Sequence, residues 1–192
     1  MQPKVKLLAF DTSAAHCAAA LLLGDRIVTR VDKMAKGQAE HLMPMLEKML
    51  HDEGINWCDL DGIGVSVGPG NFTGIRIAVS AARGLALGLG KPAIGVNGFE
   101  ARALGQERPF TATIPAPRGQ SYQQTFNIDG MTTDPVQVPL EAGPQTAAAD
   151  LIAATAKIAA SKLGADTTRP TPLYIRSADA APPRDPAPLL LP

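Results

Sequence analysis

The chain has 192 residues, of which 45% are apolar and 19% charged, so it can bury a core as one domain or two small ones, and global disorder is excluded. Eighteen Lys and Arg residues balance eighteen Asp and Glu residues, and this zero net charge argues against a protein that grips nucleic acid by itself through a basic surface. Cys17 and Cys58 form no C-x-x-C pair, which argues against a zinc site.

The first third of the chain predicts three antiparallel strands followed by a helix. The expected strands cover residues 5–10, 17–23 and 26–31. Gly24 and Asp25 form the tight turn of a hairpin between the last two strands. Apolar residues then recur with the helical period over residues 38–51, where Pro44 either lies in the first turn or kinks the helix.

The middle of the chain alternates strands with helices, which indicates a parallel portion of a sheet. The expected elements are a strand at 61–67, a helix at 72–89, a strand at 92–96 and a short helix at 98–104. Together with the opening strands, this order predicts an α/β fold with a mixed five-stranded sheet. After Gly105, strands are expected at 111–114 and 120–128, and a helix at 147–163.

No segment reads as a targeting or membrane sequence. The apolar run at residues 5–10 is too short for a signal peptide. The most apolar later stretch, residues 77–90, contains Arg83 and falls short of a membrane span. We therefore expect a cytoplasmic protein that does not associate with membranes.

The segment from Gly68 to Gly74 has the strand–turn–helix form that can cradle a phosphate group. It matches neither the P-loop pattern, because it has no lysine, nor the dinucleotide pattern, because its last glycine comes one residue late. A tight corner that needs glycine for close packing is the competing interpretation. A carboxylate at the end of the first strand could hold Mg²⁺ beside such a loop, or it could cap its own turn. The candidate residues of this vestigial phosphate loop are Asp11, Thr12, Ser13, Gly68, Gly70 and Gly74.

Two further patterns point weakly to catalysis. Ser66 lies in a G-x-S-x-G sequence, but the fold that uses this pattern needs a histidine later in the chain, and none follows His51. His41 has Met45, not a second histidine, four residues later, so the helical metal-ligand pattern is absent. We predict no catalytic residues and no metal site.

Two neighbouring helices favour a protein interface. Small residues recur in helix 72–89 at three- and four-residue spacing, which lets another helix approach closely. Methionines, which are frequent at partner surfaces, cluster in and beside helix 38–51, although an ordinary methionine-filled core would look the same. The stripe formed by Ile75, Val79, Ala82 and Leu89 also suits a sheet, so the outward side stays open. The candidate contact residues are Leu42, Met45, Leu46, Met49, Ile75, Val79, Ala82 and Leu85.

Several segments resemble the TsaB (YeaZ) family. They are FDTS at 10–13, AEHLMPMLEKML at 39–50, VGPGNFTGIRIAVSAARGLALGL at 67–89, IGVNGFEA at 94–101 and PLYIR at 172–176. The GPGxFTGxR part is highly specific, whereas FDTS alone would be weak. The resemblance covers nearly all of residues 5–105 and returns at about 147–182.

The resemblance implies an ASKHA-type fold, the architecture of actin, sugar kinases and Hsp70, and a non-catalytic scaffold role in making threonylcarbamoyladenosine beside the tRNA anticodon. It implies pairing with the paralogue TsaD, which holds the metal and transfers the carbamoyl group, through a helical bundle that matches residues 38–50 and 72–89. The ATPase TsaE would dock on that pair, tRNA would be met only through the complex, and no cofactor is expected. Without TsaD, the same helices would form a homodimer. The rival functions are an ASKHA nucleotide-binding phosphotransferase and a glycoprotease-like peptidase.

The second lobe departs from the family pattern. The family usually carries I-D-A-R-x-G-E-V-Y, whereas residues 114–122 read IPAPRGQSY, without either acid. This departure puts TsaE docking in doubt. The expected organisation is an N-terminal lobe at 1–105, a shortened second lobe at 106–146, a helix and segment at 147–176 that return to the first lobe, and a Pro-rich tail at 177–192.

Overall fold

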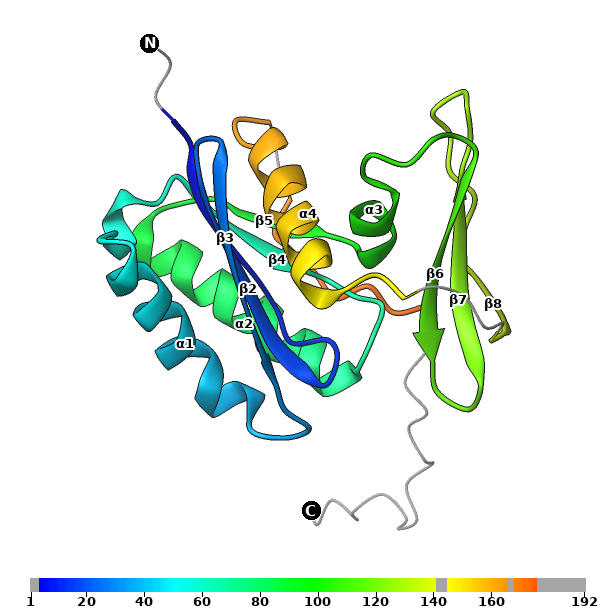
Figure 1. Ribbon diagram of the computed structural model, residues 1–192, viewed down its shortest axis with the longest axis horizontal. Coiled ribbons are helices and arrows are strands. Elements are labelled where there is room, and N and C mark those ends of the chain that lie inside the picture. Colours follow the sequence, from blue (N-terminus) through cyan, green and yellow to red (C-terminus); the bar gives the residue numbers. More distant parts are fainter. Residues whose placement is uncertain (1–3, 141–144, 166–167, 176–192) are drawn as a thin grey trace, which may run out of the picture.

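Two sheets of unequal size and four α-helices make up the part of the chain that the structure describes, residues 4–140, 145–165 and 168–175 (Figure 1). The structure is a computed structural model. The expected Pro-rich tail at 177–192 lies outside the described residues.

The larger sheet has five strands in the order β3-β2-β1-β4-β5. They are β1 (Lys6–Asp11), β2 (His16–Leu23), β3 (Arg26–Lys33), β4 (Gly62–Ser66) and β5 (Ala93–Val96). The first three strands pair antiparallel, and β4 pairs parallel with both β1 and β5. This arrangement confirms the predicted α/β fold with a mixed five-stranded sheet.

Helices cover both faces of this sheet (Figure 1). They are α1 (Gln38–Asp52), α2 (Phe72–Leu89), α3 (Gly98–Ala103) and α4 (Ala148–Ser161), with a short 3₁₀ turn at Trp57–Asp59. Alternation along β1 separates the two cores, because successive strand residues point to opposite faces. Leu8 and Phe10 pack with α1 and α2, whereas Leu7 and Ala9 pack with α4.

The second sheet is a small antiparallel meander. It contains β6 (Phe110–Ala116), β7 (Gln120–Phe126) and β8 (Val136–Pro139). Phe99 of α3 is fully buried against Ala112, Ile114 and Phe126, so α3 joins this sheet to the rest of the molecule. The sequence did not predict β8, because four residues that end in a proline carry too little strand signal.

Two details of α1 and α2 bear on expectations from the sequence. Pro44 lies inside α1 and is exposed, in a helix that continues to Asp52, so of its two possible places the first turn is excluded. The 18 residues of α2 have a mean hydropathy of 1.3 and are long and apolar enough, by composition, to cross a membrane. This composition is weak evidence for a membrane span, since core helices of soluble proteins share it, and α2 packs on β4.

The structure also corrects the choice of contact residues on α1 and α2. Seven of the eight belong to the core between these helices and the sheet, with exposed fractions of at most 4%, and only Leu85 is partly exposed. They are buried because the sheet offers the nearest apolar surface for the apolar stripe of each helix. Any surface that α1 and α2 present to a partner must therefore use the opposite sides of the two helices.

Candidate functional site

One stripe of the outward side of α2, next to the exposed Arg76 and Arg83, is apolar and smooth. Gly84 and Gly88 are exposed, and a Cβ added at either position would meet no atom within 4 Å. Leu87 between them is 82% exposed, and Ile77 and Ala81 are only partly buried. Residues without side chains at a four-residue spacing leave a shallow channel along the helix into which another helix can pack closely.

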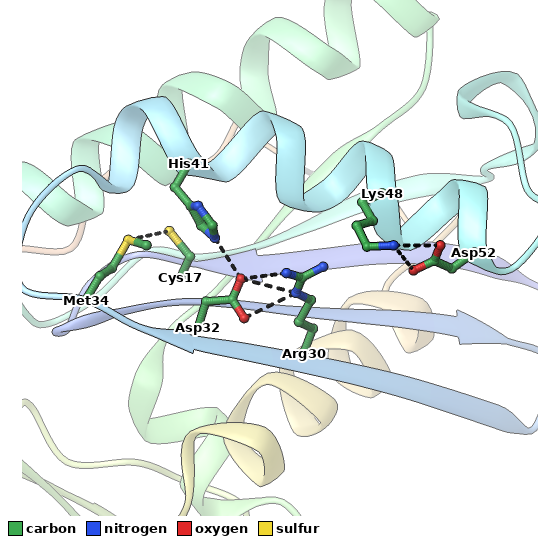
Figure 2. A network of polar contacts seen from close by, with 7 residues as sticks. All are labelled: Cys17, Arg30, Asp32, Met34, His41, Lys48 and Asp52. Carbon is green, nitrogen blue, oxygen red and sulfur yellow. Dashed lines mark hydrogen bonds and ion pairs between the residues drawn. The ribbon is translucent and has the colours of Figure 1, made fainter.

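Figure 2 shows His41 of α1 pointing toward Asp32 of β3, so a polar contact joins one side of this helix to the edge strand of the sheet. His41 Nε2 lies 2.7 Å from Asp32 Oδ2, and Asp32 also accepts hydrogen bonds from Arg30 Nε at 3.1 and 3.2 Å. Lys48, on the same side of the helix, pairs with Asp52. By helical spacing Met43, which is 38% exposed, lies on the side of α1 that faces α2. Met43 of α1 and Ile77, Ala81, Gly84 and Gly88 of α2 therefore form an open apolar strip along the two helices.

Burial and the nearby carboxylates Asp32 and Asp11 raise the pKa of the Cys17 thiol to about 11. Its Sγ lies 3.7 Å from Met34 Sδ (Figure 2). A thiol in this state is neutral at pH 7, so Cys17 acts as a core residue and not as a nucleophile.

We predict that Asp32→Asn lowers the stability of the protein at pH 7. We also expect the stability of the variant to fall less than that of the wild type as the pH is lowered. Hydrogen bonds from Arg30 Nε, followed by the contact with His41, hold the pKa of the Asp32 carboxyl below its usual value, against the opposing effect of burial. The carboxylate therefore contributes stability above its ordinary pKa and loses that contribution as the pH falls through its lowered folded-state pKa.

Thermal unfolding of both proteins between pH 7 and pH 3 measures this effect. The wild-type curve should fall more steeply at the acid end than the variant curve. Asp25→Asn is the control, since the Asp25 side chain is 99% exposed and lies 3.7 Å from Lys4. Parallel pH curves for the wild type and Asp32→Asn would contradict the assignment.

The residues of the predicted phosphate loop come together, but the amides at the start of α2 that the structure shows bonded are used within the protein. The backbone N–H of Asn71 donates to the Ser13 carbonyl at 2.7 Å, and the Asn71 side chain accepts from Gly74 N at 2.8 Å. A Cβ on Gly74 would lie 1.9 Å from the Thr12 carbonyl oxygen, and one on Gly70 would lie 2.6 Å from that of Ser13. These glycines let two backbone segments touch, which supports the packing interpretation.

Asp11 lies between Ser66 and His16, which does not suit a hydrolase. The parallel register that pairs Phe10 with Val65 places Asp11 beside Ser66 on the same face, whereas His16 comes from β2 on the other side of Asp11. Asp11 Oδ1 accepts from Ser13 N at 2.8 Å, and Oδ2 lies 3.4 Å from His16 Nε2. A serine nucleophile needs its base in contact, and no hydrogen bond joins Ser66 to a histidine within the described residues.

The charge of Asp11 is fixed by its own turn. Burial alone would raise its pKa, but the hydrogen bonds from His16 and the Ser13 backbone outweigh burial and lower it. Asp11 therefore caps its own turn as a carboxylate, which was the alternative to holding Mg²⁺. Across residues 4–140, 145–165 and 168–175, no group of three or more His, Cys, Asp or Glu side chains is placed to hold a metal ion.

A contact that the sequence did not predict ties the end of the described chain to α2. Arg76 lies 3.7 Å above the Phe72 ring, and its Nε donates to the Tyr174 hydroxyl at 2.9 Å. Leu173 N donates to the Val67 carbonyl at 2.7 Å. Tyr174 and Arg76 both belong to segments that resemble the family, PLYIR and GIRIAV, but nothing in the sequence indicated that these two segments are in contact.

The comparisons with known proteins place this arrangement in a family. The sequence model of TsaD, tRNA N6-adenosine threonylcarbamoyltransferase, matches residues 32–162. The chain belongs to this family. Within it, the chain resembles the TsaB (YeaZ) proteins, as its sequence motifs indicated. A TsaB relative, the tRNA threonylcarbamoyladenosine biosynthesis protein of Escherichia coli K12, is 31% identical over 130 residues, which cover 65% of this chain and 56% of the relative.

A transferase and a solved structure extend this likeness. The tRNA N6-adenosine threonylcarbamoyltransferase of Jannaschia sp. CCS1 is 47% identical over 70 residues, 36% of this chain and 20% of the relative. The structure of YeaZ from Pseudomonas aeruginosa superposes with a TM-score of 0.70 at 24% identity, covering 89% of this chain and all of that one. The ASKHA-like fold is thus confirmed. The chain spans about half the length of the curated TsaB relatives it matches.

Proposed function

We propose that this chain is a non-catalytic partner subunit for tRNA threonylcarbamoyladenosine synthesis. The chain covers only part of its curated relatives, so their activity is transferred here as a proposal. The observation that carries it is the open apolar strip on α1 and α2, defined by Met43, Ile77, Ala81, Gly84 and Gly88. A strip of this kind, bordered by charged residues, is typical of a protein interface.

The partner that suits the strip is a TsaD-type threonylcarbamoyltransferase. One such enzyme, that of Jannaschia sp. CCS1, shares a 70-residue segment with this chain at 47% identity. In this proposal a related pair of helices of the enzyme packs against α1 and α2 in a pseudosymmetric bundle. Two copies of this chain would use the same strip when the partner is absent. In this proposal tRNA contact and TsaE docking belong to the assembled complex, in the cytoplasm, and the chain carries no cofactor.

A non-catalytic role is supported by the polar groups near Ser66. Asp11 is committed to its own turn, and His16 lies on the far side of Asp11 from Ser66. The subunit would therefore act by stabilising the active conformation of its partner, in proportion to its differential affinity for the two states of that partner.

The test is reconstitution of the modification from purified proteins. The chain, the transferase of the same organism and the carbamoyl donor are mixed with unmodified tRNA, and threonylcarbamoyladenosine is measured by mass spectrometry. We expect product only when both proteins are present, together with a stable complex in size-exclusion chromatography. Product from this chain alone, or equal activity of the transferase without it, would overturn the proposal.

A further inference from the structure

A cavity lies on the opposite face of the larger sheet from the proposed interface. It has a volume of about 640 Å³ and is enclosed by the ends of β1 and β4, by α3, by the start of α4 and by β6. In Figure 1, α4 begins in the space between the two sheets. Crevices at the carboxyl ends of parallel strands are common ligand sites in α/β folds. Apolar residues, among them Ala101, Ile114 and Ile152, form much of its wall.

The start of α4 faces this cavity without a side-chain cap. Its N-cap residue is Ala147, which has no side-chain oxygen to accept from the first amides of the helix. Ala148 and Ala149 line the cavity. The first amides of a helix have no partner inside the helix, and together with the helix dipole they favour an anion.

Ser66 supplies an independent observation. It is 7% exposed, it lies on the α4 face of the sheet at the end of β4, and it lines the same cavity. Its hydroxyl has no hydrogen-bond partner among the described residues, although its neighbour Thr155 bonds to the Leu151 carbonyl. Ser66 Oγ opens onto the cavity and has no protein partner within the described residues, so it is available to donate to or accept from a bound group.

Arg102 supplies the charge. Its Nη1 donates to the Gly98 carbonyl at 3.0 Å, and within the described residues no carboxylate oxygen lies within 4 Å of its guanidinium. Burial lowers the pKa of Arg102, and the more distant charge of Asp11 only partly opposes this effect. A half-buried guanidinium with free N–H groups is suited to bind an oxyanion through paired hydrogen bonds.

We propose that this cavity binds a small oxyanion, a carboxylate or phosphate group, through the first amides of α4, the Ser66 hydroxyl and the Arg102 guanidinium. Pro69 and Gly70 of the Gly68–Gly74 turn also line the cavity, but the amides of Asn71 and Gly74 are bonded within the protein, so the proposed site does not rely on them. Asp11 repels an anion, which therefore lies toward Arg102 and α4. The proposal is independent of the proposed partner function, because the two sites occupy opposite faces of the sheet.

The experiment is an NMR titration of the whole chain with inorganic phosphate, and separately with acetate, at constant ionic strength. We expect saturable shifts of the Ala148 and Ala149 amide signals, and the ion that saturates at lower concentration identifies the group. Arg102→Gln should weaken binding at least tenfold and Ser66→Ala about threefold, the latter corresponding to loss of one hydrogen bond. Arg83→Gln, at an exposed position on α2, should leave binding unchanged.

The titration also has outcomes that overturn the proposal. Shifts that increase linearly with both ions, or that map to surface lysines instead of the start of α4, would do so. So would equal weakening by Arg102→Gln and Arg83→Gln. If Arg102→Gln does not give the wild-type spectrum, the wild-type titration and Ser66→Ala decide the question, because removing one unpartnered hydroxyl leaves the fold unchanged.

Discussion

We expect Gly84→Gln to weaken binding to the proposed threonylcarbamoyltransferase partner at least tenfold while it raises the thermal stability of the isolated chain. The Cβ of residue 84 meets no atom of this chain, so the longer side chain is accommodated without strain. Gln is favoured over Gly inside a helix by roughly 0.5–1 kcal/mol, so the folded state gains stability. The same side chain fills the channel where a partner helix would approach, and affinity should fall at least tenfold, about 1.4 kcal/mol.

Isothermal titration calorimetry and thermal unfolding of the same samples measure the two effects. Gly84→Ala is the graded control, since it should gain a similar stability but lose much less affinity. Lys157→Gln, exposed on α4 on the opposite layer, should change neither. Wild-type affinity in a well-folded Gly84→Gln variant would show that the partner does not pack on this side of α2. A charge at Val79 cannot make this test, because Val79 is a core residue.

Gly74→Ala should destabilise the chain by about 3 kcal/mol or more, although alanine is the better helix former. A Cβ at this position would lie 1.9 Å from the Thr12 carbonyl oxygen, which is backbone and cannot move aside as a side chain can. The loop at Thr12 would have to separate from α2 and would lose the hydrogen bond from Thr12 Oγ1 to the Gly74 carbonyl.

Urea unfolding of Gly74→Ala and Gly84→Ala tests this expectation directly. The two variants carry the same substitution in the same helix and should change the free energy of unfolding in opposite directions. Two variants with equal stability would mean that the β1–β2 loop does not rest on the start of α2 as described.

The sequence alone determined α2 and the chain order of the strands and helices that form the larger sheet. Residues 72–89 were predicted with the bounds that the structure has, because Asn71 caps the start and Gly90, in the left-handed conformation, ends the helix. The five strands follow from apolar runs separated by turn residues, and their parallel portion follows from the intervening helices. The TsaB-like motifs pointed to the family through the same segments.

The orientation of α1 and α2 depended on tertiary structure. Helical period shows which residues share a side, but α2 is apolar on most of its circumference, so the period alone could not show which side meets the sheet. One signal was available: Arg76 and Arg83 are exposed and lie opposite Ile75, Val79 and Ala82. Two charges on one side of an apolar helix mark the side that points away from the protein's own core.

The candidate site divides in the same way. Composition and small-residue spacing in the sequence identified the two helices that present an apolar strip. Sequence motifs identified Asp11, Ser66 and the Gly68–Gly74 turn as candidate residues at strand ends. Only the fold could show that Asp11 separates Ser66 from His16, or bring Arg102, Ser66 and the start of α4 around one cavity. The physical reason is that spacing along a chain fixes local geometry, whereas contacts between distant segments depend on which apolar surfaces the whole chain can bury together.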